Sequence, residues 1–76
     1  MVRFAVHAAE RCKERQVTSA MIEWVLSHPV GGPDAGDFGK LAYSGYVQGG
    51  RKPVLKVVVD AADKEMIISV MWKDSI

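Results

Sequence analysis

The sequence predicts an α+β fold in which two N-terminal helices pack on a three- to four-stranded antiparallel β-meander. Helical periodicity is confined to the first third of the chain, and a glycine- and proline-rich segment follows at residues 30–39. The remainder alternates between strand-forming runs and short turns. The chain has 76 residues, 49% of them hydrophobic and 25% charged, which is ordinary for a folded domain. Residues 1–76 are therefore expected to form a single domain.

The first helix is predicted from about Val6 to Gln16. Small residues recur at spacings of three and four, which gives this segment a narrow apolar face, formed by Ala5, Ala8, Ala9 and Cys12. Most of the intervening positions hold strong helix formers. We expect this face to pack against the rest of the domain.

The second helix is predicted to begin after Thr18, whose hydroxyl is a natural N-cap. It ends near His28, because the residue before Pro29 is disfavoured in the helical region. A broad apolar arc marks its buried side, formed by Met21, Ile22, Trp24, Val25 and Leu26. Residues 30–39 then have the composition of a loop.

Three strands are predicted in the rest of the chain, at residues 41–48, 54–60 and 65–73. Residues 49–53 have the composition of a hairpin loop, and residues 61–64 form the next turn. Sequential strands joined by short turns pair antiparallel, which produces the meander.

Alternation along these strands divides the side chains between two faces. The face predicted to pack on the helices holds Leu41, Tyr43, Val47, Leu55, Val57, Val59, Met66, Ile68, Val70 and Trp72. The opposite face combines Ser44, Tyr46, Lys56, Ser69 and Lys73 with the apolar Val54, Val58, Ile67 and Met71. Such an apolar set on a solvent face predicts association with a second copy or another protein. The alternative is that the N-terminal residues or the long loop cover it.

The first helix also carries the candidate catalytic residues. His7, Arg11 and Arg15 recur every four residues and so form one stripe along the helix. Imidazole transfers protons near neutral pH, and guanidinium groups bind phosphate oxygens, which are the two abilities that metal-free RNA cleavage requires. The alternative is a solvated helix side on which Glu10 and Glu14 pair with the basic residues.

The net charge of +1 conceals an uneven distribution of charge. Residues 40–59 hold four basic residues and no acidic one, and residues 1–16 hold four basic and two acidic residues. Basic groups beside an exposed aromatic ring are typical of RNA-binding surfaces. The candidate RNA contacts are Lys40, Tyr46, Arg51, Lys52, Lys56 and Lys73. The alternative is that these cations serve solubility alone.

Composition excludes several other kinds of site. The single Cys12 cannot form an internal disulfide, and His7 and His28 are too few for a multi-histidine metal centre. We therefore expect no metal and no cofactor. The N-terminus lacks the apolar run of a signal peptide, and no stretch is long enough to span a membrane. These features predict a cytoplasmic protein without a membrane partner.

The same segments resemble a bacterial domain-of-unknown-function family. Its first helix carries the pattern H-A-x-x-R-x-x-x-R, matched here from His7 to Arg15, and its second ends before a proline, as at His28-Pro29. A Val-rich hairpin and an aromatic-Lys ending also match, at Val57-Val58-Val59 and Met71-Trp72-Lys73. That family is similar to the RelE-type and BrnT-type toxins, small α+β ribonucleases held inactive by an antitoxin.

The resemblance implies a toxin-like endoribonuclease that acts without a metal, with His7, Arg11 and Arg15 at the family's polar signature positions. The Ser-Ala-Arg-Arg ending of BrnT-type toxins is absent here. Two alternatives remain open. One is a non-catalytic module that binds a protein, either a cognate antitoxin or a second copy, through the outer sheet face. The other is an RNA-binding protein that does not cleave its ligand.

Overall fold

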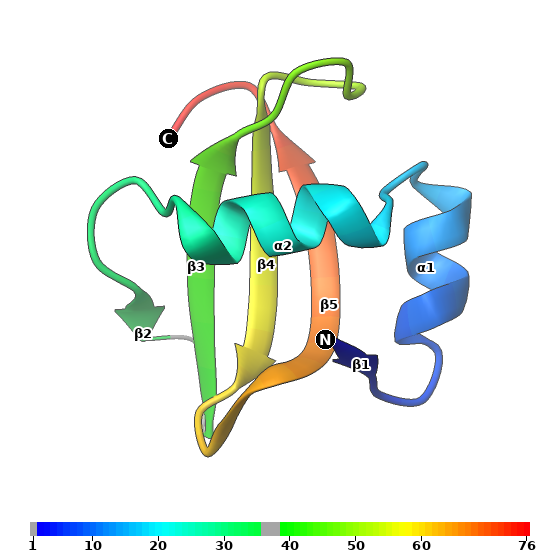
Figure 1. Cartoon of the computed structure of the whole chain (residues 1–76), viewed down its shortest axis with the longest axis vertical. Coiled ribbons are helices and arrows are strands. Elements are labelled where there is room, and N and C mark those ends of the chain that lie inside the picture. Colours follow the sequence, from blue (N-terminus) through cyan, green and yellow to red (C-terminus); the bar gives the residue numbers. More distant parts are fainter. Residues whose placement is uncertain (1, 36–38) are drawn as a thin grey trace.

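The computed structural model describes residues 2–35 and 39–76, and it has the α+β class that the sequence predicts (Figure 1). Two helices accompany a mixed sheet with the strand order β1-β5-β4-β3-β2. In chain order the elements are β1 Arg3–Phe4, α1 Ala8–Glu14, α2 Ser19–Ser27, β2 Asp34–Ala35, β3 Lys40–Tyr46, β4 Val54–Asp60 and β5 Asp63–Lys73.

The centre of the sheet is the predicted meander, because β3 pairs antiparallel with β4 and β4 pairs antiparallel with β5. The prediction of a purely antiparallel sheet that follows two helices is wrong, since β1 precedes the helices and runs parallel to β5. Strand β2 adds an antiparallel pair on the other edge. Both added strands are two residues long, too short to leave an alternating pattern in the sequence. Of the predicted loop at 30–39, residues 36–38 lie outside the described part of the chain.

A bulge in β5 corrects the predicted division between the faces. Val58 pairs with Ser69 but Val59 pairs with Ile67, so Ile68 has no direct partner and the alternation shifts by one residue. Ile67 is therefore fully buried in the core, where alternation placed Ile68. Of the other residues predicted for this face, Tyr43, Leu55, Val57, Val59 and Val70 are buried, whereas Met66 does not belong to the core.

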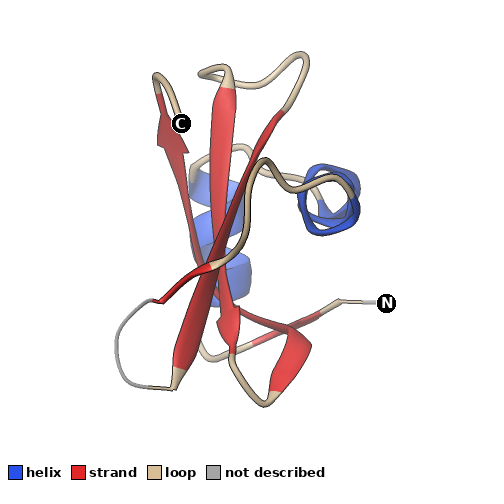
Figure 2. Cartoon of the chain, turned by 90° about the vertical axis from the view of Figure 1, so that its left-hand side faces the viewer, coloured by secondary structure: helices blue, strands red, loops and turns tan. Residues whose placement is uncertain are grey.

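Helix α2 lies across the inner face of the sheet and contacts β3 and β4 (Figures 1 and 2). Figure 2 shows α2 end-on to one side of the strands, with no helix on the opposite side. Gly45 permits this close approach, because a Cβ there would lie 3.3 Å from the His28 carbonyl and 3.4 Å from Val25 Cγ2. Thr18 caps the helix as predicted, since its Oγ1 accepts a hydrogen bond from the Met21 amide at 3.2 Å.

Helix α1 does not lie on the sheet face but stands beside β5, which it contacts, beyond the short stretch of β5 that pairs with β1 (Figure 1). The expectation that both helices pack on one face of the meander is thus only partly correct. Strand β1 pairs with β5 at Met66 and Ile67, and α1 shields the part of this edge that follows. Covering an edge strand prevents its free backbone groups from pairing with another chain.

Both ends of α1 use left-handed backbone, which makes the helix shorter than predicted. His7, the N-cap, has φ 68°, and Gln16, just beyond the C-cap, has φ 58°. At the C-terminal end the Val17 amide donates to the Cys12 carbonyl at 2.8 Å and the Gln16 amide to the Lys13 carbonyl at 3.2 Å. These two bonds form a Schellman motif, in which glycine usually takes the position of Gln16.

Candidate functional site

The three candidate catalytic residues lie along α1 without converging on one another. His7 is exposed, and its Nδ1 lies 3.5 Å from the Glu10 carboxylate. Arg11 is exposed on the helix. No side-chain hydrogen bond or ion pair joins these residues to one another within the described ranges. His7 and Arg11 are thus accessible from solvent.

Arg15 is half-buried and takes part in the tertiary contacts of α1. Its guanidinium donates a hydrogen bond to the Val70 carbonyl on β5. In return the Trp72 indole Nε1 donates to the Arg15 carbonyl at 2.7 Å. These two bonds attach the C-terminal end of α1 to the strand that it shields.

Cys12 lies one turn before this end of the helix. Its side chain is buried, and desolvation raises the pKa of the thiol above its usual range, although the nearby Arg15 charge acts in the opposite direction. A thiol held protonated in this way is a core residue rather than a nucleophile.

Four of the six predicted RNA contacts lie on the outer sheet face, the face opposite α2. Lys40 and Tyr46 are at the two ends of β3, and alternation along the strand places both side chains on the face that α2 does not cover. Across the strands, Tyr46 is in register with Val54 and Lys73, and the adjacent row contains Lys56. Among the residues that the structure describes, no carboxylate forms an ion pair with Lys56 or Lys73.

The other two predicted contacts, Arg51 and Lys52, lie in the exposed loop between β3 and β4. The Lys52 ammonium is 3.6 Å from the Asp74 carboxylate, an exposed pair that solvent screens strongly. This loop begins just after Tyr46 and returns at Val54, so its cations are near the Tyr46 end of the outer sheet face.

The apolar part of the outer sheet face is smaller than alternation predicts. Ile67 belongs to the core, and Val54 is fully buried between Tyr46 and Lys73. Val58 is half-buried, and Met71 is 44% exposed. Of the four apolar residues predicted for this face, Val58 and Met71 are therefore the two that keep exposed surface.

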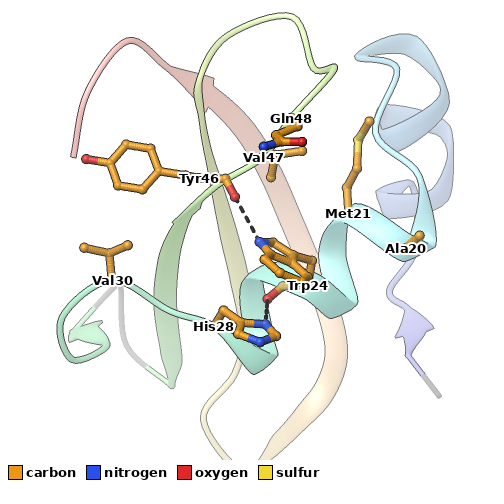
Figure 3. A pocket seen from close by; sticks show the side chains of 8 residues that line it. All are labelled: Ala20, Met21, Trp24, His28, Val30, Tyr46, Val47 and Gln48. Atoms are coloured by element: carbon orange, nitrogen blue, oxygen red, sulfur yellow. Dashed lines mark hydrogen bonds between the residues drawn. The ribbon is translucent and has the colours of Figure 1, made fainter.

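A pocket of about 570 Å³ lies between α2 and the end of β3 (Figure 3). Helix α2 and its C-cap contribute Ala20, Met21, Trp24 and His28. The facing segments contribute Val30, Tyr46, Val47 and Gln48. None of the described residues that line it is an aspartate, glutamate, lysine or arginine.

Two aromatic rings form a fixed wall of this pocket. The Trp24 and His28 rings stack with centroids 4.0 Å apart and an interplanar angle of 21°. The Trp24 indole Nε1 donates to the Tyr46 carbonyl at 3.0 Å, and the His28 Nδ1 lies 3.3 Å from the Trp24 carbonyl (Figure 3). Trp24 is nevertheless 52% exposed.

Sequence reasoning missed this pocket because it assigned Trp24 to the buried arc of the helix and His28 to the helix end. The available signal was the spacing of four residues between two rings on one helix, which places them side by side. The exposure of Trp24 and His28, and the position of Tyr46 across the pocket from them, depend on how α2 crosses β3.

Within residues 2–35 and 39–76, no group of three or more histidine, cysteine, aspartate or glutamate side chains is placed to hold a metal ion. Neither helix in this part of the chain has the length and apolar character needed to cross a membrane. No protein-family model, curated protein or solved structure matches the chain. Its function must therefore be inferred from the arrangement of its own side chains.

Proposed function

We propose that this protein binds single-stranded RNA across the outer sheet face and acts on it as a toxin-like endoribonuclease or a close relative of one. The observation that carries the proposal is that Lys40, Tyr46, Lys56 and Lys73 share one sheet face over which no described helix lies. They come from three strands, so the tertiary structure gathers cations that are dispersed in the sequence.

The chemistry of this face suits single-stranded RNA better than double-stranded nucleic acid. Lysine ammonium groups neutralise phosphates without reading sequence, which makes binding sensitive to salt. The Tyr46 ring, 57% exposed, offers a flat surface on which an unpaired base can stack. An uncovered sheet face that carries the exposed Tyr46 ring supports contact with a flexible single strand.

Cleavage is assigned to α1, where His7 and Arg11 are accessible. His7 is proposed to transfer a proton and Arg11 to stabilise the charge that develops on the phosphate. Arg15, predicted from sequence to join them, is engaged with Val70 and is assigned to hold α1 on β5.

The test of cleavage compares wild-type protein with His7→Asn on single-stranded RNA. Asparagine is among the residues that tolerate the left-handed backbone of this position, so the variant removes the imidazole without adding strain. We expect cleavage to fall by at least about a hundredfold, the usual contribution of a general acid or base. Cleavage at the wild-type rate would remove His7 from the mechanism.

The test of binding uses Lys56→Ala combined with Lys73→Ala. We expect weaker RNA binding and a shallower dependence of the binding constant on salt, because two phosphate contacts are lost. Binding without any cleavage by the wild type would favour the RNA-binding alternative. Growth inhibition on expression in bacteria, lost in Arg11→Ala, would favour the toxin.

A second candidate function rests on Val58 and Met71, two apolar residues of the outer sheet face that keep exposed surface. It is association with a cognate antitoxin or a second copy of the chain. Sedimentation of the purified protein, compared with Met71→Lys, tests self-association. A monomer at every concentration would exclude the dimer.

A further inference from the structure

We infer that the pocket between α2 and the end of β3 receives a base of the bound RNA strand. This inference rests on the proposed function and adds a specific subsite to it. The site includes Trp24, His28, Val30, Tyr46 and Gln48 (Figure 3). It lies between α2 and the end of β3, and of its lining residues Tyr46 also belongs to the outer sheet face, on which the Lys56 and Lys73 ammonium groups are proposed to hold phosphates.

Large apolar side chains are exposed at this pocket to an unusual degree. Trp24 is 52% exposed, Tyr46 57% and Val30 39%, and all three line the same space. Single exposed apolar residues are common on protein surfaces, but a cluster around one cavity marks a binding site. Two of the three are aromatic, which favours a flat ligand.

The pocket is also prepared for such a ligand. The Trp24 indole is held by its stacking on His28 and by its hydrogen bond to the Tyr46 carbonyl. A base that stacks against this ring would therefore require little loss of side-chain freedom on the protein side. Base-on-aromatic stacking tolerates different bases, because every base has a π-face.

The polar groups of the pocket fit the edge of a base. The Gln48 amide supplies both donors and an acceptor, and the His28 ring adds a second nitrogen beyond the one near the Trp24 carbonyl. Among the described residues, no aspartate, glutamate, lysine or arginine side chain lines the space, so a phosphate would find no charged partner there. The chemistry is that of a neutral, planar group with a polar rim.

Cations that could bind the phosphates of the RNA lie outside the pocket, on the outer sheet face and in the hairpin loop. Tyr46 links the pocket to the outer sheet face, since it lies in register with Val54 and Lys73. Arg51 and Lys52 follow Gln48 closely in the loop. A proline-rich peptide also docks on exposed aromatic rings. The cations on the outer sheet face and in this loop favour a polyanion over such a peptide.

The experiment measures binding of two probes of equal length: a single-stranded RNA, and an abasic oligomer that keeps the phosphates but lacks the bases. The proteins are wild type, Trp24→Ala, Trp24→Phe and the control Val6→Ala. Val6 is 83% exposed and belongs neither to the pocket lining nor to the outer sheet face. Circular dichroism checks that each variant is folded. If Trp24→Ala does not fold, the comparison is made between wild type and Trp24→Phe.

We expect Trp24→Ala to weaken RNA binding at least about fivefold, in keeping with the loss of one stacked base, and to leave binding of the abasic oligomer and the salt dependence unchanged. Trp24→Phe should retain part of the preference for RNA, and Val6→Ala all of it. RNA binding that is indifferent to Trp24 would overturn the base pocket and leave the proposed function standing. Failure of the wild type to bind either probe would overturn both, as would Trp24-dependent binding of a proline-rich peptide without RNA.

Discussion

The two tryptophans make the same kind of hydrogen bond in opposite surroundings. Trp72 Nε1 donates to the Arg15 carbonyl at 2.7 Å, and Trp24 Nε1 donates to the Tyr46 carbonyl at 3.0 Å. Trp72 packs against the hydrophobic core and is half-buried, whereas Trp24 lines an open pocket and is 52% exposed.

The difference lies in what each ring connects. Trp72 joins the end of α1 to β5, and its ring also fills the space above Gly50 in the hairpin loop. Trp24 joins α2 to the end of β3, two elements that already pack together through Gly45. Trp72 is therefore expected to contribute more to stability, and Trp24 remains available for the base binding proposed above.

The largest expected effect comes from truncating the two rings separately. Trp72→Ala should lower the free energy of unfolding by about 3 kcal/mol, because a large packed ring and a hydrogen bond are lost together. Trp24→Ala should cost about 1 kcal/mol, since its ring is half in water already. Urea denaturation measures both values. Equal losses would break the distinction between the two regions.

The hairpin loop offers a second way to test the Trp72 region. A Cβ on Gly50 would run into the Trp72 indole, so Gly50→Ala should destabilise by about 2 kcal/mol as the ring shifts. Gly32→Ala is the matched control, because a Cβ there has nothing within 4 Å. Thermal unfolding of the two variants gives the comparison. If Gly50→Ala is as stable as Gly32→Ala, the loop does not pack on Trp72.

The two arginines of α1 are proposed to have different roles: Arg15 holds the helix on β5, and Arg11 acts in RNA cleavage. Arg15→Ala should lower the free energy of unfolding by about 1 kcal/mol, because the Val70 carbonyl loses its guanidinium partner. Arg11→Ala should change stability by less than about 0.5 kcal/mol, since the side chain is exposed. RNA cleavage is measured alongside. Abolished cleavage in a fully stable Arg15→Ala would instead place Arg15 among the catalytic residues.

The smallest expected effect is a gain in stability at the C-terminal end of α1, which Trp72 holds on β5. Gln16 has φ 58°, a conformation that glycine adopts without a steric penalty, so Gln16→Gly should raise the free energy of unfolding by up to about 1 kcal/mol. Gln16→Ala keeps the Cβ and should give no gain. Chemical denaturation decides. A loss in Gln16→Gly would mean that this Schellman motif is not strained.

Much of the fold was predictable because it depends on neighbours in the sequence. The Thr18 cap, the end of α2 before Pro29 and the bounds of β4 all follow from local rules. The bulge at Ile68 and the two-residue strands were not predictable, since each depends on pairing with residues far away in the chain.

The candidate site divides in the same way. Basic side chains on alternating strand positions predicted that Tyr46, Lys56 and Lys73 would share a face, and the register places them in adjacent rows. The helical spacing of His7, Arg11 and Arg15 predicted a single stripe, but left-handed backbone at His7 and the bond from Arg15 to Val70 give the three residues different surroundings.

By itself, the sequence determined the α+β class, the central meander and the local concentration of positive charge. Each of these follows from residue type and spacing, which act over a few positions along the chain. Tertiary structure alone decided that Trp72 packs against the core and that Trp24 stays exposed beside Tyr46. Burial depends on what packs opposite a side chain, and for both rings the partner is a backbone segment more than 20 positions distant.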